Sequence, residues 1–280
     1  MLIKFWGVHG SLPRPGRSTL KYGGNTACVE VRCGKTLIIL DAGTGIRELG
    51  EELMRRQEGS NRNPDRIVAH IFFSHLHWDH VQGFPFFDPV FKRGNEFHLY
   101  GSGDLDRAVY QVLKSHMSPP NFPVKLEDLP ASLDFHHLIP GDQLSIDGVS
   151  VVVGKLNHPG GSCGYRLEYQ GSSLVYASDT EQVDGIDRAV LDLARDADVL
   201  IHDSMFAPDQ YLGLWDDIPR QSWGHSTWES AIEVARAAGV KRLILFHHGN
   251  DDRVVEAIER SAQEIFPGTA AAYEGLELEF

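Results

Sequence analysis

The chain has 280 residues, of which 42% are hydrophobic, 10% aromatic and 23% charged. This composition excludes an intrinsically disordered chain and is sufficient for a globular fold with a large core. The formal net charge of −13 would repel a long phosphate backbone, so we expect no extended nucleic-acid partner. A small anionic substrate held by metal cations escapes this objection.

The cysteine content and the apolar runs limit the cellular setting. Cys28, Cys33 and Cys163 are too few for a disulfide framework and lack C-x-x-C spacing, so we expect reduced packing residues. No apolar run approaches the roughly 20 residues that span a bilayer. Residues 1–7 lack the basic head and long apolar stretch of a signal peptide. We therefore expect a cytoplasmic protein without a membrane partner.

The first half of the chain alternates short β-branched or apolar runs with segments of helical spacing. The runs predict strands at residues 2–8, 27–32, 36–40, 67–73 and 97–100. Helical spacing predicts helices at residues 46–56 and 105–116. Residues 118–130 contain four prolines, which predicts an irregular linker or surface arm.

The second half repeats this order of elements. Strands are predicted at residues 149–156, 163–169, 173–177, 199–202 and 243–246, and helices at 227–238 and 253–264. Ser226 and Glu229 fit a capping box at the start of the helix at 227–238, and Gly239 fits its end. Without a short internal repeat, we interpret residues 1–280 as one domain of two related halves.

Metal-binding residue types gather directly after the predicted strand at 67–73. With 14 histidines in the whole chain, His75, His77, Asp79 and His80 within six positions are improbable by composition alone. Alternate residues at a strand end point the same way, so His75 and His77 can share one cation. Asp79 and His80 on the following turn can face a second cation. The alternative is a solvated polar loop or a set of core histidines.

This His-x-His-x-Asp-His turn after an apolar strand resembles the signature of the metallo-β-lactamase superfamily. The resemblance implies an α/β fold, the αββα sandwich, in which two mixed sheets pack face to face with helices outside. It extends over nearly the whole chain, because the family has a further His, a bridging acid and a last His, each after a strand. His158, Asp179 and His247 match these positions. Asp41, in Asp-Ala-Gly-Thr-Gly, resembles a structural turn of the fold and is assigned no chemistry.

The resemblance implies two groups of metal ligands that share one acid. The first metal would take His75, His77 and His158, the second Asp79, His80 and His247, and Asp179 would bridge both. His248 is the alternative last ligand; His247 is preferred because it directly follows the strand in Leu-Phe-His. Mixed imidazole and carboxylate ligands suit zinc, manganese or iron, and zinc is the commonest expectation.

A second set of residues resembles ribonuclease Z and the small cyclic phosphodiesterases. These enzymes share the Gly-His-Ser-Thr segment around His225, and they have Glu where this chain has Asp203. The resemblance implies that His225 protonates the leaving oxygen while Asp203 holds its imidazole in the charged form. Together with Asp79, these residues form the predicted catalytic set. The alternative is a plain helix cap beside an unrelated buried histidine.

Three functions follow from these motifs. Two metals about 3.5–4 Å apart can activate a bridging hydroxide and neutralise developing charge, which suits a phosphodiesterase acting on a small cyclic or nucleotide phosphodiester. Transfer-RNA processing is a variant that the acidic charge disfavours. A lactonase, thioesterase or β-lactamase-type hydrolase would share the ligand frame, and a non-catalytic metal-binding module is the third alternative. Related phosphodiesterases suggest a homodimer, by analogy only.

Overall fold

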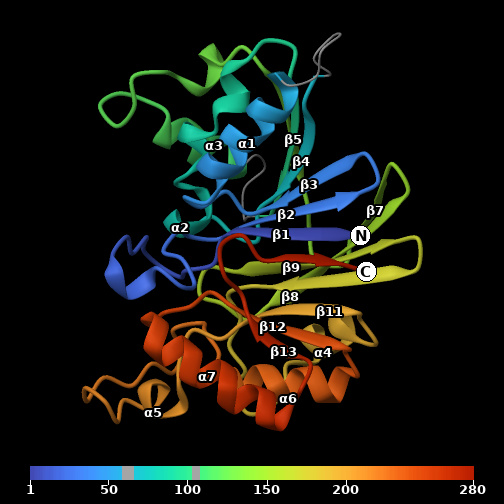
Figure 1. The fold of residues 1–280 in the computed structure, drawn as a ribbon. Coiled ribbons are helices and arrows are strands. Elements are labelled where there is room, and N and C mark those ends of the chain that lie inside the picture. The colour runs from blue at the N-terminus through green and yellow to red at the C-terminus, as the bar shows by residue number, and fades with distance from the viewer. Residues whose placement is uncertain (59–65, 103–107) are drawn as a thin grey trace.

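The computed structural model describes residues 1–58, 66–102 and 108–280. Within these residues, two mixed β-sheets of seven strands each lie face to face between outer layers of helices (Figure 1). The α/β class and the αββα sandwich expected from the sequence are therefore confirmed. Among the same residues, no helix combines the length and apolar character needed to cross a bilayer.

The first sheet has the order β14-β1-β2-β3-β4-β5-β6. It is antiparallel from β14 to β3 and parallel from β3 to β6. Its strands are β1 (Leu2–Gly7), β2 (Cys28–Cys33), β3 (Thr36–Leu40), β4 (Val68–Phe72), β5 (Glu96–Gly101), β6 (Ser132–His137) and β14 (Glu277–Glu279). The C-terminal strand β14 thus joins the sheet of the first half.

The second sheet has the order β13-β12-β11-β10-β9-β8-β7. It is antiparallel from β7 to β10 and parallel from β10 to β13, which repeats the pairing of the first sheet. Its strands are β7 (Gln143–Ile146), β8 (Val149–Leu156), β9 (Ser162–Tyr169), β10 (Ser172–Ala177), β11 (Val199–Asp203), β12 (Arg242–Phe246) and β13 (Thr269–Ala271). Each sheet thus has an antiparallel part followed by a parallel part.

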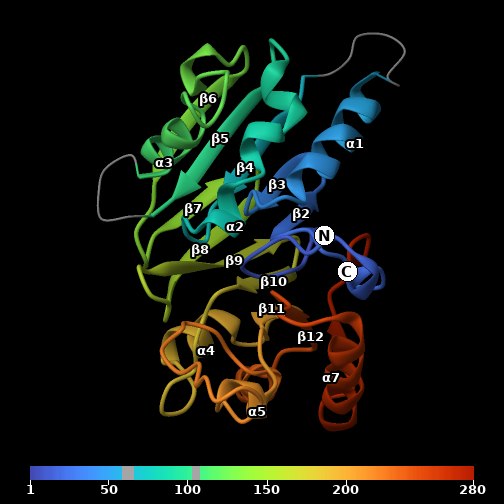
Figure 2. The ribbon, with the colours of Figure 1, turned by 90° about the vertical axis from the view of Figure 1, so that its left-hand side faces the viewer.

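The helices cover the outer faces of the two sheets (Figure 2). The α-helices are α1 (Ile46–Glu58), α2 (Trp78–Val81), α3 (Ala108–His116), α4 (Arg188–Ala194), α5 (Pro208–Tyr211), α6 (Trp228–Ala238) and α7 (Asp252–Ile265). Short 3-10 turns are η1 (Arg17–Thr19), η2 (Phe84–Phe86), η3 (Asp88–Phe91) and η4 (Leu126–Asp128). Helices α1 and α3 pack on the first sheet, and α4 and α6 pack on the second.

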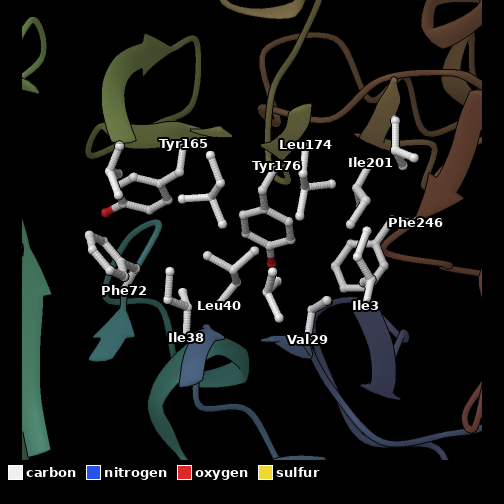
Figure 3. Close-up of a cluster of buried hydrophobic side chains, with 14 of the residues drawn as sticks. Ile3, Val29, Ile38, Leu40, Phe72, Tyr165, Leu174, Tyr176, Ile201 and Phe246 are labelled. Atoms are coloured by element: carbon white, nitrogen blue, oxygen red, sulfur yellow. The ribbon is translucent and has the colours of Figure 1, made fainter. Parts of the chain in front are cut away.

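The main hydrophobic core fills the space between the sheets (Figure 3). Phe72 of the first sheet meets Tyr165 of the second at a centroid distance of 5.1 Å, and Phe5 meets Phe246 at 6.0 Å. Burial of each such aromatic side chain stabilises the fold by about 1.5–3 kcal/mol. The core therefore fixes the two sheets against each other and sets the positions of their strand ends.

The start of α6 differs from the sequence prediction. The capping box from Ser226 to Glu229 was wrong, because the N-cap is Thr227, whose Oγ1 accepts a hydrogen bond from the Ser230 amide at 3.2 Å. The hydroxyl of Ser226 instead donates to the Thr180 carbonyl at 2.6 Å. Gly239 ends the helix with φ 70, as predicted for a left-handed C-cap.

Other differences concern short or weakly patterned elements. Residues 105–107 of the predicted helix at 105–116 lie outside the described residues, and the helix is seen from Ala108. The proline-rich residues 118–130 are irregular except for the single turn η4. The cysteines are free and buried, in agreement with a packing role. The sequence prediction lacked β6, β7, β13, β14, α2, α4 and α5.

Candidate metal centre

The predicted ligands lie just past the ends of four strands. The residues from His75 to His80 follow β4, His158 follows β8, Asp179 follows β10 and His247 follows β12. They form two groups of mutually close ligand atoms, one of His75, His77 and His158 and one of Asp79, His80, Asp179 and His247. Both sheets therefore contribute to one site, and the two groups match the two predicted ligand sets.

The first group consists of imidazoles alone. Nδ1 of His77 lies 3.1 Å from Nε2 of His158. Nδ1 of His158 lies 2.8 Å from the Gly224 carbonyl, which can only accept, so this nitrogen carries the proton. The lone pair of His158 Nε2 is thereby left for a cation. Nε2 of His75 is buried without a hydrogen-bond partner among the described residues.

The second group contains the carboxylates. Nε2 of His80 and Nε2 of His247 lie 3.3 Å apart. Oδ2 of Asp79 lies 3.3 Å from His80 Nε2 and 3.1 Å from His247 Nε2. Oδ1 of Asp179 lies 3.2 Å from both nitrogens. Its other oxygen, Oδ2, faces the first group, 3.7 Å from His75 Nε2 and 3.9 Å from His158 Nε2. Asp179 thus lies between the two groups.

His247 and His248 take different places. Gly10 packs against the His247 ring so closely that an added Cβ would lie 2.5 Å from His247 Nδ1. The ring of His248 lies apart from both ligand groups, since its Nε2 donates to the Ala272 carbonyl at 2.9 Å. The geometry therefore favours His247 over His248 as the candidate last ligand.

The Ser11 amide, next to Gly10, donates to Asp79 Oδ2 at 2.7 Å.

Asp41, to which the sequence analysis assigned no chemistry, contacts one of the candidate ligands. It follows β3, is fully buried, and its Oδ2 accepts a hydrogen bond from His80 Nδ1 at 2.8 Å. The hydroxyls of Ser74 and Tyr176 donate to the same oxygen, each at 2.7 Å. A carboxylate behind a metal-ligating histidine fixes its tautomer and makes it a more basic ligand. The available signal was an acid directly after a strand that neighbours β4.

The electrostatics and spacing of the cluster suit divalent cations. Burial alone would raise the pKa of Asp179, but the imidazoles of His247, His80 and His75 together hold it well below its usual value. Two nitrogens that bind one tetrahedral zinc at about 2.0–2.1 Å lie about 3.3 Å apart. The separations of 3.1 Å and 3.3 Å in the two groups are close to this value. With the unpartnered His75 Nε2, the donor set therefore fits metal ions.

His225 lies beside this cluster, in the loop before α6. Its Nδ1 donates to Asp203 Oδ2 at 2.8 Å, so the shorter Asp203 still reaches the imidazole. The amides of Ser226 and Met205 hold the other oxygen of Asp203 at 3.0 Å and 3.1 Å. Burial alone would lower the pKa of His225, but the carboxylates of Asp203, Asp179 and Asp79 outweigh it and raise the pKa to about 9. This arrangement leaves Nε2 as the ring nitrogen that can transfer a proton.

Curated relatives of this chain include enzymes named ribonuclease Z. A ribonuclease Z of Methanosarcina mazei is 29% identical over 325 aligned positions, covering 99% of this chain and 97% of the relative. A ribonuclease Z of Bacillus subtilis is 26% identical, covering 76% and 81%.

Two solved structures share the fold. The metallo-β-lactamase fold protein YhfI of Bacillus subtilis has a TM-score of 0.73 at 18% identity, covering 100% of this chain and 98% of that one. Zinc-bound PqqB of Methylobacterium extorquens has a TM-score of 0.72 at 17% identity, covering 100% of both chains. The model of the Beta-lactamase superfamily domain matches residues 36–248, more than half of the sequence. This chain is therefore a member of the β-lactamase superfamily.

Proposed function

We propose that this protein is a metal-dependent phosphodiesterase with two divalent cations. Zinc is the first candidate for both ions. One would be held by His75, His77 and His158 and the other by Asp79, His80 and His247, with Asp179 shared. Divalent cations bound there would lower the pKa of an attacking water and would neutralise charge on the phosphate. The observation that carries the proposal is the Asp203–His225 pair beside Asp179, with His225 Nδ1 3.8 Å from Asp179 Oδ2.

The side chains of the protein provide the remaining chemistry. The departing alkoxide of a phosphodiester needs a proton, and Nε2 of His225 would deliver it. Asp203 would keep the ring oriented and charged through the 2.8 Å hydrogen bond to Nδ1. Asp79, which accepts a hydrogen bond from the Ser11 amide, would complete the catalytic set as a ligand of the second cation. A lactone or thioester would not require such a proton donor next to the cluster.

The substrate class is part of the proposal. A small anionic substrate, such as a cyclic or nucleotide phosphodiester, is our first candidate because the net charge of −13 opposes long polyanions. RNA is the second candidate, because the curated relatives are named ribonuclease Z. The names of these relatives argue against our expectation that the protein has no extended nucleic-acid partner. The homodimer and the cytoplasmic location stay predictions.

A substrate screen tests the proposed class directly. Protein loaded with zinc or with manganese would be assayed against cyclic nucleotides, ribose cyclic phosphates, a short RNA, aryl phosphodiesters, lactones and thioesters. We expect hydrolysis of phosphodiesters. The rates with cyclic nucleotides and ribose cyclic phosphates, compared with the rate with RNA, decide between the two substrate candidates. Turnover of lactones or thioesters with no diester cleavage would overturn the proposal.

The role of His225 predicts a selective kinetic defect. In His225→Ala, kcat/KM for a diester with a poor leaving group should fall by roughly 10²–10⁴-fold, because general acid catalysis is lost. An activated aryl diester, whose leaving group needs no proton, should be hydrolysed at a nearly unchanged rate. Asp203→Asn should show the same selectivity to a smaller extent. Equal losses on both diesters would argue against proton donation by His225.

A further inference from the structure

Glu181 is a buried carboxylate close to the candidate site. It lies two residues after Asp179, between β10 and α4, and is only 2% exposed. Its Oε1 accepts hydrogen bonds from the Tyr211 hydroxyl at 2.5 Å and from the Ser222 amide at 2.7 Å. Its Oε2 accepts one from the Gly224 amide at 2.8 Å. This carboxylate therefore ties the β10–α4 loop to both ends of the segment 211–224.

The backbone of Glu181 also holds the loop after β8. Its amide donates to the Asn157 carbonyl at 2.9 Å, and its carbonyl accepts from Asn157 Nδ2 at 3.0 Å. Asn157 immediately precedes His158. One residue thus contacts the loops that carry His158 and Asp179, together with the segment that leads to His225.

Gly224 connects Glu181 to the two functional histidines. Its carbonyl accepts the proton on His158 Nδ1 at 2.8 Å, and His225 follows it in the chain. The residue has φ +86, and an added Cβ would lie 2.3 Å from His158 Nδ1. Because this backbone is packed against the His158 ring, a shift of the Gly224 peptide must move that ring.

We propose that Glu181 is a positioning residue that acts through Gly224 on His158 and His225. By holding the Gly224 amide, it places the carbonyl that orients His158 and fixes the start of the His225 loop. Changing the carboxylate to an amide turns one acceptor into a donor facing buried N–H or O–H groups, so at least one hydrogen bond is lost. The kinetic consequence rests on the proposed phosphodiesterase activity, whereas the metal-binding consequence rests only on the proposed metal centre.

The matched variants are Glu181→Gln and Glu30→Gln. Glu30 is also a buried carboxylate, 1% exposed, but its partners Trp6, Arg32 and Arg56 are outside the site. In Glu181→Gln we expect the zinc dissociation constant of the site formed by His75, His77 and His158 to rise roughly 10–100-fold, the range for loss of a hydrogen bond to a metal-binding histidine. On the zinc-loaded enzyme, kcat for the poor-leaving-group diester should fall while KM changes little. Glu30→Gln should lower only the melting temperature.

The outcomes separate positioning from simple stabilisation. If Glu181→Gln binds zinc as tightly as the wild type and only melts earlier, as Glu30→Gln does, the proposal is wrong. If Glu181→Gln does not fold, Tyr211→Phe decides, because it removes one donor and keeps both amide contacts. We then expect a smaller rise in the zinc dissociation constant, about 3- to 10-fold, and an unchanged constant overturns the proposal. A wild type that cleaves no diester refutes the proposed function, while the zinc titration still tests Glu181.

Discussion

Asp41 places a buried negative charge behind one candidate ligand without belonging to either ligand group. It accepts the Nδ1 proton of His80 at 2.8 Å, so it keeps the lone pair of Nε2 directed to the cluster. In Asp41→Asn, the amide nitrogen would face donors such as Ser74 and Tyr176. We expect metal affinity to fall by roughly 10–100-fold, measured by competition with a chromophoric chelator.

Tyr176→Phe is the control for Asp41→Asn. It removes one hydrogen bond to Asp41 Oδ2 and leaves the His80 contact in place. Its metal affinity should therefore stay closer to that of the wild type. If metal affinity falls equally in the two variants, or falls in neither, the Asp41 carboxylate does not determine how His80 binds metal.

The candidate site could be predicted from the sequence where residues cluster after a strand or match a family motif. His75, His77 and His80 cluster after one apolar strand, whereas His158, Asp179 and His247 were assigned through the family resemblance. The ends of these strands meet at one edge of the fold. The contacts of Ser11 with Asp79, Asp41 with His80, and Glu181 with Gly224 join residues tens of positions apart. Strand periodicity contains no information on which distant side chain or amide will complete a hydrogen bond. These supporting residues therefore emerged only from the structure.

At the scale of elements, the C-terminus of α6 offers a test of stability without function. Gly239 has φ 70, where a side chain is strained, and its amide closes the helix. Gly239→Ala should destabilise the protein by about 1 kcal/mol, a melting-temperature decrease of roughly 2–4 °C. Gly16→Ala is the control, because an added Cβ there meets nothing within 4 Å. An equal decrease in both variants would contradict the role of the left-handed cap.

The elements absent from the sequence prediction are those that depend on their neighbours. Strands β13 and β14 have three residues each, too few for a periodic pattern, and are held by pairing with β12 and β1. Strand β6 contains Asp134 and consecutive histidines, which obscure its alternation, but it pairs with β5 along its whole length. Helix α4 has seven residues, about two turns. Long apolar strands, by contrast, were predicted within a residue or two at each end.

At the scale of the whole molecule, the candidate ligands join the two halves. The residues from His75 to His80 come from the first sheet, whereas His158, Asp179 and His247 come from the second. Ions bound between them would cross-link the sandwich at the edge where the strand ends meet. Because the cluster also gathers buried carboxylates and imidazoles, we expect the free energy of folding of the protein to depend on bound cations.

Removal of metal should therefore destabilise the entire protein. An ion that binds only the folded state stabilises it by about 4 kcal/mol when its free concentration is 1,000 times the dissociation constant. We expect chelation to lower the melting temperature by roughly 10 °C, and added zinc to restore it. Asp179→Ala should already lack metal by elemental analysis and should melt at the same temperature with or without chelator. A chelated wild type that has lost its metal yet melts unchanged would show that the ions do not hold the halves together.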